Sequence, residues 1–252
     1  MSLKFDHALV TVPSLAEACM DFASAGFTVT PGGKHEGTPT ENALVILEGG
    51  SYIELFALRD PSMRADLQSR RSWRDVDALG RRFLAAFLGP FGIADVVFRA
   101  PALERYVSMA KLRGVPVDGP YSMGRERPDG VRLAWKLALP MSRELPFLIE
   151  DVTPIERRVP SDPDMRRHTN GASAVTSVEI AVGNVPEALL VWRHWLDLGP
   201  VPAGDDEVWL GVGGLRVRLY NAAGGRPGPQ RLVLSGAASL PEAVTSLRIA
   251  SA

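Results

Sequence analysis

The chain has 252 residues, of which 46% are hydrophobic and 23% are charged, and its formal net charge is −1 at pH 7. This balance is typical of a globular protein and excludes a disordered or fibrous chain. So small a charge produces no overall field that attracts nucleic acid or an anionic membrane, and we expect neither as a partner. The single cysteine, Cys19, has no internal disulfide partner, and residues 1–10 lack a signal-peptide pattern, so the expected location is cytoplasmic.

The first 58 residues predict the element order βαβββ. Residues 5–12 alternate in polarity, as a half-buried strand does, and end at Pro13-Ser14, a helix-start signal. Apolar residues from Leu15 onward recur at helical spacing until Gly26. Three further strands are predicted over residues 27–30, 43–47 and 51–58.

The same order recurs 88 residues later. This shift aligns Pro13-Ser14-Leu15 with Pro101-Ala102-Leu103, and Gly26-Phe27 with Gly114-Val115, without a gap. The first strand, the helix and the later strands of the second unit are predicted over residues 93–99, 103–113, 131–139 and 146–151. Residues 61–88, between the two units, carry apolar residues at helical spacing and predict one or two connecting helices.

A weaker third copy spans residues 175–220, and a fourth begins at residue 230 with one strand and one helix. Residues 151–171 are charged, carry three prolines and lack periodicity, which is typical of a linker. We therefore predict a domain over residues 1–172 and a degenerate third module with a partial fourth over residues 173–252. The first domain divides into modules 1–58 and 92–152 and a helical connector, 59–91.

Several motifs in the first 172 residues resemble the glyoxalase-like branch of the vicinal oxygen chelate superfamily. They are Asp6-His7, Gly32-Gly33-Lys34-His35, Thr40-Glu41-Asn42-Ala43, Tyr52-Ile53-Glu54-Leu55, Pro146-Phe147-Leu148-Ile149-Glu150 and His168-Thr169-Asn170-Gly171-Ala172. The resemblance implies an α+β fold in which tandem βαβββ modules form cupped mixed sheets, followed here by an incomplete second pair of modules.

The resemblance also implies a divalent metal in the cup, held by one first-strand residue and one last-strand glutamate from each module. In module one these positions are His7 and Glu54. In module two the 88-residue shift points to Asp95, and the apolar frame of the last strand points to Glu150. One imidazole and three carboxylates would suit Zn²⁺, Mn²⁺, Fe²⁺, Ni²⁺ or Mg²⁺. Glu54 and Glu150 are then the candidate catalytic residues, because a carboxylate displaced from the metal can act as a general base.

Four residues are candidates for substrate contacts. His35 and Asn42 accompany a glycine-rich loop whose backbone can approach a ligand closely. Tyr52 shares one face of its strand with Glu54, and Arg125 could orient a carboxylate or a phosphate. The structural alternative for His35 is a histidine on a surface loop, and the alternative for Arg125 is an arginine in a solvated turn. For the metal positions, the alternatives are a hydrogen-bonded strand histidine at His7 and a backbone contact at Asp95.

The third module provides an internal comparison. Aligning its Gly213-Gly214 turn with Gly49-Gly50 puts Arg218 in the place of Glu54, and Ser177 falls in the place of His7. Both predicted ligand positions are lost there. We expect this module to cover a sheet face or to make a subunit contact, which allows a homodimer.

Two functions follow from these predictions. The first is a metal-dependent enzyme of the lyase, isomerase or dioxygenase type acting on a small oxygenated substrate. The second is a metal-free protein that binds and sequesters a small molecule on the same scaffold. Three carboxylates in one cup favour the first, because they would repel one another without a cation. An aromatic lining would favour the second.

Overall fold

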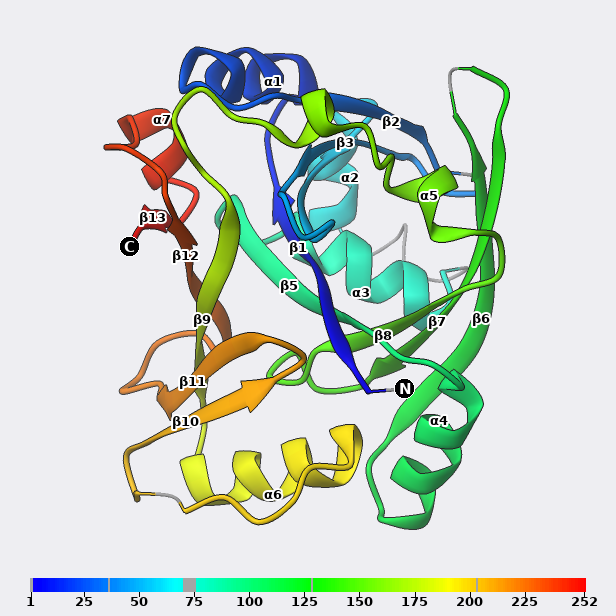
Figure 1. Ribbon diagram of the computed structural model, residues 1–252. Coiled ribbons are helices and arrows are strands. Elements are labelled where there is room, and N and C mark those ends of the chain that lie inside the picture. Colours follow the sequence, from blue (N-terminus) through cyan, green and yellow to red (C-terminus); the bar gives the residue numbers. More distant parts are fainter. Residues whose placement is uncertain (1, 36, 70–75, 128, 203) are drawn as a thin grey trace.

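The computed structural model describes residues 2–35, 37–69, 76–127, 129–202 and 204–252. Its first half forms one strongly curved, mixed eight-stranded sheet with the strand order β2-β3-β4-β1-β5-β8-β7-β6 (Figure 1). We call the concave side of this sheet the cup. The second half forms a separate five-stranded sheet with the order β10-β11-β9-β12-β13. The predicted α+β class with cupped mixed sheets is confirmed.

Module one has the predicted order βαβββ, but its second strand spans Thr30–Lys34 and not residues 27–30 as predicted. Its helix begins after Ser14, whose side chain accepts a hydrogen bond from the Glu17 amide at 3.3 Å, and ends before Gly26, which has a positive φ of 83°. The elements are β1 (Lys4–Thr11), α1 (Leu15–Ser24), β2 (Thr30–Lys34), β3 (Thr40–Ile46) and β4 (Tyr52–Leu58).

Module two repeats this order and pairs with module one through β1 and β5, which run antiparallel. In that pairing His7 lies opposite Val97 and Leu9 lies opposite Asp95. These two pairs are equivalent when each residue of β1 is matched with the residue 88 positions later in β5, His7 with Asp95 and Leu9 with Val97. The predicted 88-residue shift is therefore confirmed for the first strands. The elements are β5 (Gly92–Arg99), α4 (Leu103–Leu112), β6 (Val117–Glu126), β7 (Arg132–Pro140) and β8 (Phe147–Asp151).

The described part of the connector contains two helices, α2 (Met63–Gln68) and α3 (Ala78–Ala86), in agreement with the prediction of one or two. Residues 70–75 of the predicted connector lie outside the described part of the chain. Asp77 caps α3 by accepting a hydrogen bond from the Gly80 amide at 2.7 Å. Helix α3 packs on the concave side of the sheet (Figure 1), and it brings Arg82 and Phe83 toward the cup.

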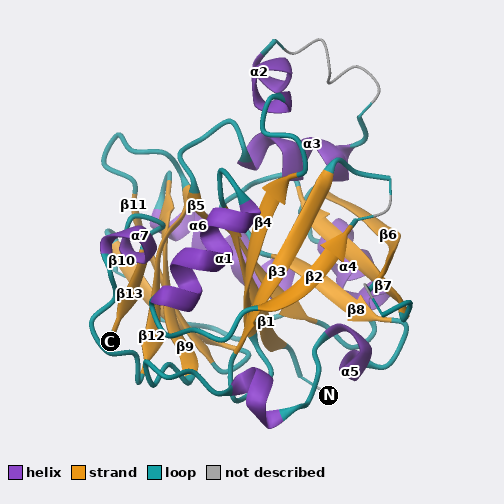
Figure 2. Cartoon of the chain, turned by 90° about the horizontal axis from the view of Figure 1, so that it is seen from above, coloured by secondary structure: helices purple, strands orange, loops and turns teal. Residues whose placement is uncertain are grey.

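The second sheet carries the degenerate modules. Its central strands β9 and β12 pair antiparallel, as β1 and β5 do in the first sheet. Seen from above, the strands of the two sheets form two groups side by side (Figure 2). The elements after β8 are α5 (Ile155–Arg158), η2 (Pro163–Arg166), β9 (Ala174–Val182), α6 (Val185–Leu196), β10 (Glu207–Val212), β11 (Leu215–Asn221), β12 (Gly228–Ser235), α7 (Glu242–Thr245) and β13 (Ile249–Ser251).

Strand register confirms the alignment of the third module. Arg218 pairs with Glu179, two residues beyond Ser177, just as Glu54 pairs with Leu9, two residues beyond His7. Arg218 forms ion pairs with two carboxylates of its own sheet, Glu179 at 3.2 Å and Glu207. The third module therefore has no counterpart of the His7 and Glu54 pair.

One large apolar core fills the space between the convex side of the first sheet and the second sheet. Trp192 and Trp195 of α6 are fully buried in it. Their indole N–H groups donate to the carbonyls of Glu144 and Pro146, at 3.0 and 2.8 Å, in the loop before β8. Both sheets thus contribute to the same core, and the domain boundary between residues 172 and 173 stays a prediction.

Among the helices of the described residues, none combines the length and the apolar composition needed to cross a bilayer.

Candidate functional site

Strand alternation explains which side chains reach the cup. In β4, Ile53 and Leu55 point into the core between the sheets, so Tyr52, Glu54 and Phe56 point to the concave side. His7 reaches the same side from β1, which runs parallel to β4. The expectation that these faces converge is correct for module one.

The cup contains a cavity with about 590 Å³ of empty space, its opening included. Its polar side chains cluster on the side of module one, and its aromatic side chains come from both modules and from α3. The lining residues are His7, Leu9, His35, Thr38, Thr40, Asn42, Leu44, Tyr52, Glu54, Phe56, Phe83, Met123, Arg125, Trp135, Leu137, Phe147, Ile149 and Arg158.

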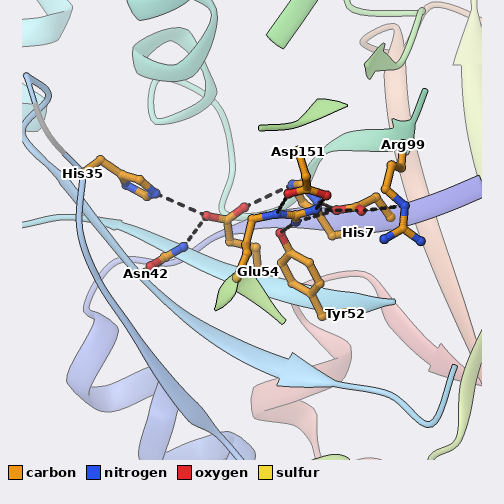
Figure 3. Close-up of polar contacts among 9 residues, drawn as sticks. His7, His35, Asn42, Tyr52, Glu54, Arg99 and Asp151 are labelled. Carbon is orange, nitrogen blue, oxygen red and sulfur yellow. Dashed lines mark hydrogen bonds and ion pairs between the residues drawn. The ribbon is translucent and has the colours of Figure 1, made fainter. Parts of the chain in front are cut away.

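Glu54 is the centre of the polar cluster (Figure 3). Asn42 donates a 2.6 Å hydrogen bond to Oε1, and the Nε2 atom of His35 lies 3.7 Å from the same oxygen. His7 Nε2 lies 3.2 Å from Oε2. Burial raises the pKa of Glu54, but the hydrogen bond and charge of His7, the charge of His35 and the Asn42 amide outweigh it and lower the pKa to about 2. Glu54 is therefore ionised at neutral pH.

His7 lies between two carboxylates. Its Nδ1 atom is 2.7 Å from Asp6, and its ring stacks on Tyr52 with centroids 4.5 Å apart. Burial lowers the pKa of His7, but the hydrogen bonds and charges of Asp6 and Glu54 outweigh this and raise it above its ordinary value. Each ring nitrogen faces a carboxylate oxygen, which is the arrangement that favours the protonated imidazolium.

The buried Arg158 side chain anchors this cluster through Asp6 and Tyr52. Arg158 of α5 contacts Asp6 at 2.7 and 3.0 Å and Asp151 at 2.7 and 2.9 Å, and it donates to the Tyr52 hydroxyl at 2.6 Å. These five contacts use all five guanidinium N–H groups. The pKa of Tyr52 lies well above its usual value, chiefly because the phenol is buried, so Tyr52 stays neutral. Arg158 therefore has a structural role and keeps no donor for a ligand.

His35 and Arg125 lie together where the two outer strands of the sheet meet. An isolated antiparallel bridge links their backbones, and the Arg125 guanidinium donates to the Gly32 carbonyl. His35 Nδ1 lies 3.1 Å from the Thr40 hydroxyl. Burial is the largest influence on His35 and lowers its pKa, so its ring is neutral at pH 7. His35, Asn42, Tyr52 and Arg125, all predicted to contact substrate, line the cavity.

Asp95 faces the concave side, but an arginine neutralises it. Arg82 of α3 forms a bidentate pair with Asp95, at 2.9 and 2.8 Å, and donates to the carbonyls of Pro140 and Leu145 at 2.5 and 2.8 Å. Asp95 is absent from the lining of the cavity. The prediction that Asp95 joins His7 and Glu54 at a metal is therefore wrong, because the connector helix supplies its counter-ion.

Glu150 lies on the other face of β8, outside the cavity. Strand pairing places Phe147 opposite Val97, as Glu54 lies opposite Leu9, so Phe147 is the counterpart of Glu54. Phe147 lies 93 residues after Glu54, and Glu150 lies three residues after Phe147. The alignment that matched Glu150 with Glu54 is therefore wrong by three residues. An odd displacement reverses the face. Glu150 instead accepts a 3.0 Å hydrogen bond from the Ala102 amide at the start of α4.

These positions do not reproduce the four-residue metal site. Within the described residues, no group of three or more His, Cys, Asp or Glu side chains is placed to hold a metal ion. His7, Glu54 and His35 come closest together, but His7 and Glu54 already pair with each other at 3.2 Å, and the guanidinium of Arg125 lines the same cavity. The observed donor set thus does not fit the divalent metal that the resemblance implies.

The sequence did not identify several residues of this site. Asp6 belongs to a motif but has no predicted role, and Arg158 lies in the segment predicted as a linker. Phe83 fell in the connector, and Phe147 was read only as part of the frame around Glu150. Two adjacent arginines after an acidic strand end, at residues 157 and 158, were the available signal, but many surface turns share it.

The comparisons agree with this fold. The family model of the glyoxalase-like domain matches residues 5–196. A hypothetical protein from Staphylococcus aureus is similar in structure, with a TM-score of 0.75 at 18% identity over 94% of this chain and 93% of that one. A mutant of 4-hydroxymandelate synthase from Streptomyces coelicolor gives a TM-score of 0.53 at 12% identity, over 97% and 74% of the chains. No curated protein matches the chain.

Proposed function

The chain belongs to the glyoxalase-like domain family of the vicinal oxygen chelate superfamily, and we propose that it binds a small aromatic carboxylate in the cup, without a metal. The observation that carries this proposal is the cavity itself, which combines an aromatic wall with Arg125, an arginine whose N–H groups are not all used within the described chain. Of the two functions considered from the sequence, this is the small-molecule binding protein.

The aromatic wall supports the apolar part of the ligand. Phe56, Phe83, Trp135 and Phe147 line the cavity, and the Phe83 ring lies 5.7 Å from that of Phe56 and 5.8 Å from that of Phe147. Pockets that bury most of a small ligand are typically lined in this way, with a few polar groups that fix its orientation.

Arg125 supports the acidic part of the ligand. Its side chain is buried at 3% residue exposure, and among the described residues its guanidinium donates to one acceptor, the Gly32 carbonyl. A guanidinium has five N–H groups and pairs with a carboxylate through two of them. The other arginine of the cavity, Arg158, has none left, so Arg125 is the group expected to meet the ligand's charge.

A second candidate function is proton transfer of the lyase or isomerase type. The observation that favours it is the approach of neutral His35 and ionised Glu54, with 3.7 Å between Nε2 and Oε1, on the wall of the cavity. A histidine that is neutral at pH 7 can accept a proton from an acidic C–H group. No step of this route passes through a metal, because the donor set does not fit one.

Calorimetric titration of the full chain tests the binding function. The probes are benzoate, phenylacetate and phenylpyruvate, with phenylacetamide as the neutral control, each measured with EDTA and again with added Zn²⁺ or Mn²⁺. We expect at least one acid to bind in EDTA and the amide to bind at least about tenfold more weakly. Arg125→Gln should lose the preference for the acid, while Arg127→Gln, a matched change at a half-buried arginine outside the cavity, should keep it.

Two outcomes would overturn the binding proposal. Binding that appears only with added metal would restore the metal-dependent function, and failure of all three acids would exclude aromatic carboxylates. Proton transfer is tested separately by NMR in D₂O. Deuterium should enter the methylene group of phenylpyruvate faster with the protein than without it, and His35→Gln should abolish the acceleration, because it removes the proton acceptor.

A further inference from the structure

A second cavity lies at the seam between the two sheets, where β5 meets β12. It encloses about 450 Å³ of empty space, its opening included. Arg143, Arg226 and Arg248 line it, from the β7–β8 loop, the β11–β12 loop and the turn before β13. We propose that this seam cavity binds a phosphate group, as inorganic phosphate or as a phosphate monoester.

The three arginines form an excess of positive charge. Among the described residues, none of the three pairs with a carboxylate, and the acid that influences Arg143, Asp95, is already held by Arg82 at 2.8 Å. Burial and the neighbouring guanidiniums together lower the pKa values of Arg143 and Arg248. Like charges held together in a partly buried place favour an anion that offsets their repulsion.

Two of these guanidiniums are fixed in place while keeping unused donors. Arg143 donates to the Ala94 carbonyl at 3.2 Å, and Arg248 donates to the carbonyls of Ile93 and Pro229 at 2.6 and 3.1 Å. Arg143 Nη1 and Arg248 Nε are buried and have no hydrogen-bond partner within the described chain. Buried charged donors without acceptors are costly, so a ligand that supplies oxygen atoms would stabilise the site.

Two glycines make room for the arginines. A Cβ at Gly89 would collide with the Arg226 guanidinium, and one at Gly92 would lie 3.0 Å from Arg248 Nε. Gly92 also has a φ of 124°, which other residues rarely adopt. The backbone just before β5 and at its first residue therefore lies closer to the Arg226 and Arg248 side chains than a residue with a Cβ atom would allow.

The number of donors favours phosphate over carboxylate. A carboxylate has two oxygens and is satisfied by one guanidinium fork, whereas a phosphate can accept hydrogen bonds from several arginines at once. Ile93 and Pro229 provide apolar walls, which exclude water and strengthen each charged contact.

Calorimetric titration of the full chain at constant ionic strength tests the proposal. The probes are inorganic phosphate, methyl phosphate and acetate. We expect phosphate or methyl phosphate to bind at least tenfold more tightly than acetate, and whichever of the two binds more tightly identifies the source of the group. Arg226→Gln and Arg143→Gln should each weaken phosphate binding by about tenfold. Arg226 is exposed, so its variant is expected to fold normally.

The matched control is Arg132→Gln, which removes the same charge from an exposed arginine elsewhere, and it should bind phosphate as the wild type does. Arg125→Gln should also leave phosphate binding intact, which separates the seam cavity from the cup. Equal phosphate binding by the wild type, Arg226→Gln and Arg143→Gln would overturn the proposal. So would equal binding of phosphate and acetate, or no binding of either phosphate probe.

Discussion

At equivalent positions on the concave side of the eight-stranded sheet, module one carries His7 and Glu54, and module two carries Asp95 and Phe147. In module one the two residues contact each other at the wall of a cavity. In module two the acid is bound to Arg82, and the aromatic ring fills the place of the second acid. A duplicated scaffold thus carries its polar centre in one half only, and the connector helix that supplies Arg82 neutralises the other half.

Two buried arginines pair with acids of the eight-stranded sheet, and Arg158 serves two of them, Asp6 from module one and Asp151 from module two. We expect Arg158→Met to lower the free energy of unfolding by about 5 kcal/mol, because it leaves buried Asp6 and half-buried Asp151 without the guanidinium that pairs with both. Urea denaturation measures the change. Arg157→Met, at the exposed neighbouring position, should change stability by at most about 0.5 kcal/mol. A similar small effect for both variants would contradict the structural role given to Arg158.

Arg82, which comes from the connector helix, serves one carboxylate, so its loss should destabilise the protein less. We expect Arg82→Met to lower the free energy of unfolding by about 3–4 kcal/mol, since Asp95 is then buried and unpaired. Adding Asp95→Leu should recover part of that loss, because an apolar pair replaces the charged one. The carbonyls that Arg82 also satisfies prevent a full recovery. A double variant no more stable than Arg82→Met would refute this account, and Arg81→Met is the exposed control.

The histidines of module one predict a maximum of stability near pH 6.5. The raised pKa of His7 contributes stability that is present below pH 6.5 and is lost as the pH rises through the folded value. The lowered pKa of His35 acts oppositely, since protonation below pH 6.5 favours the unfolded chain. Glu54, with a pKa of about 2 against 4.5, loses its contribution as the pH falls below 4.5.

Denaturation midpoints measured from pH 4 to pH 9 test this maximum. His7→Asn should remove the decline on the alkaline side and keep the decline on the acid side. An unchanged alkaline decline in His7→Asn would show that another group causes it.

The smallest expected effect is spectroscopic. Glu54→Gln should lower the pKa of His7, because it removes one of the two carboxylates that stabilise the imidazolium. NMR titration can follow this, since the chain has four histidines. Glu150→Gln is the matched control on the opposite face of β8 and should leave the pKa of His7 unchanged. Equal shifts in the two variants would mean that Glu150 belongs to the same site.

The sequence was enough to predict the tandem modules and the polar half of the cup. Alternation along 52–58 placed Tyr52, Glu54 and Phe56 on one face, and the helix signals at Ser14 and Gly26 were read correctly. These features depend on residues close together in the chain, so local periodicity and turn chemistry determine them. The glycine-rich loop predicted before His35 is instead strand β2, and Asn42 lies in β3, so strand pairing and not a loop brings these side chains to the cup.

The tertiary structure alone decided which charges meet. Arg158 comes from a segment without periodicity and pairs with Asp6, and Arg82 comes from the connector and pairs with Asp95. Such pairs form across long sequence separations, and no spacing rule selects one arginine among 28 basic residues. The face of Glu150 was misjudged for a related reason. Side chains alternate at each residue of a strand, so an insertion of unknown length between two modules leaves the face undetermined until the strands are paired.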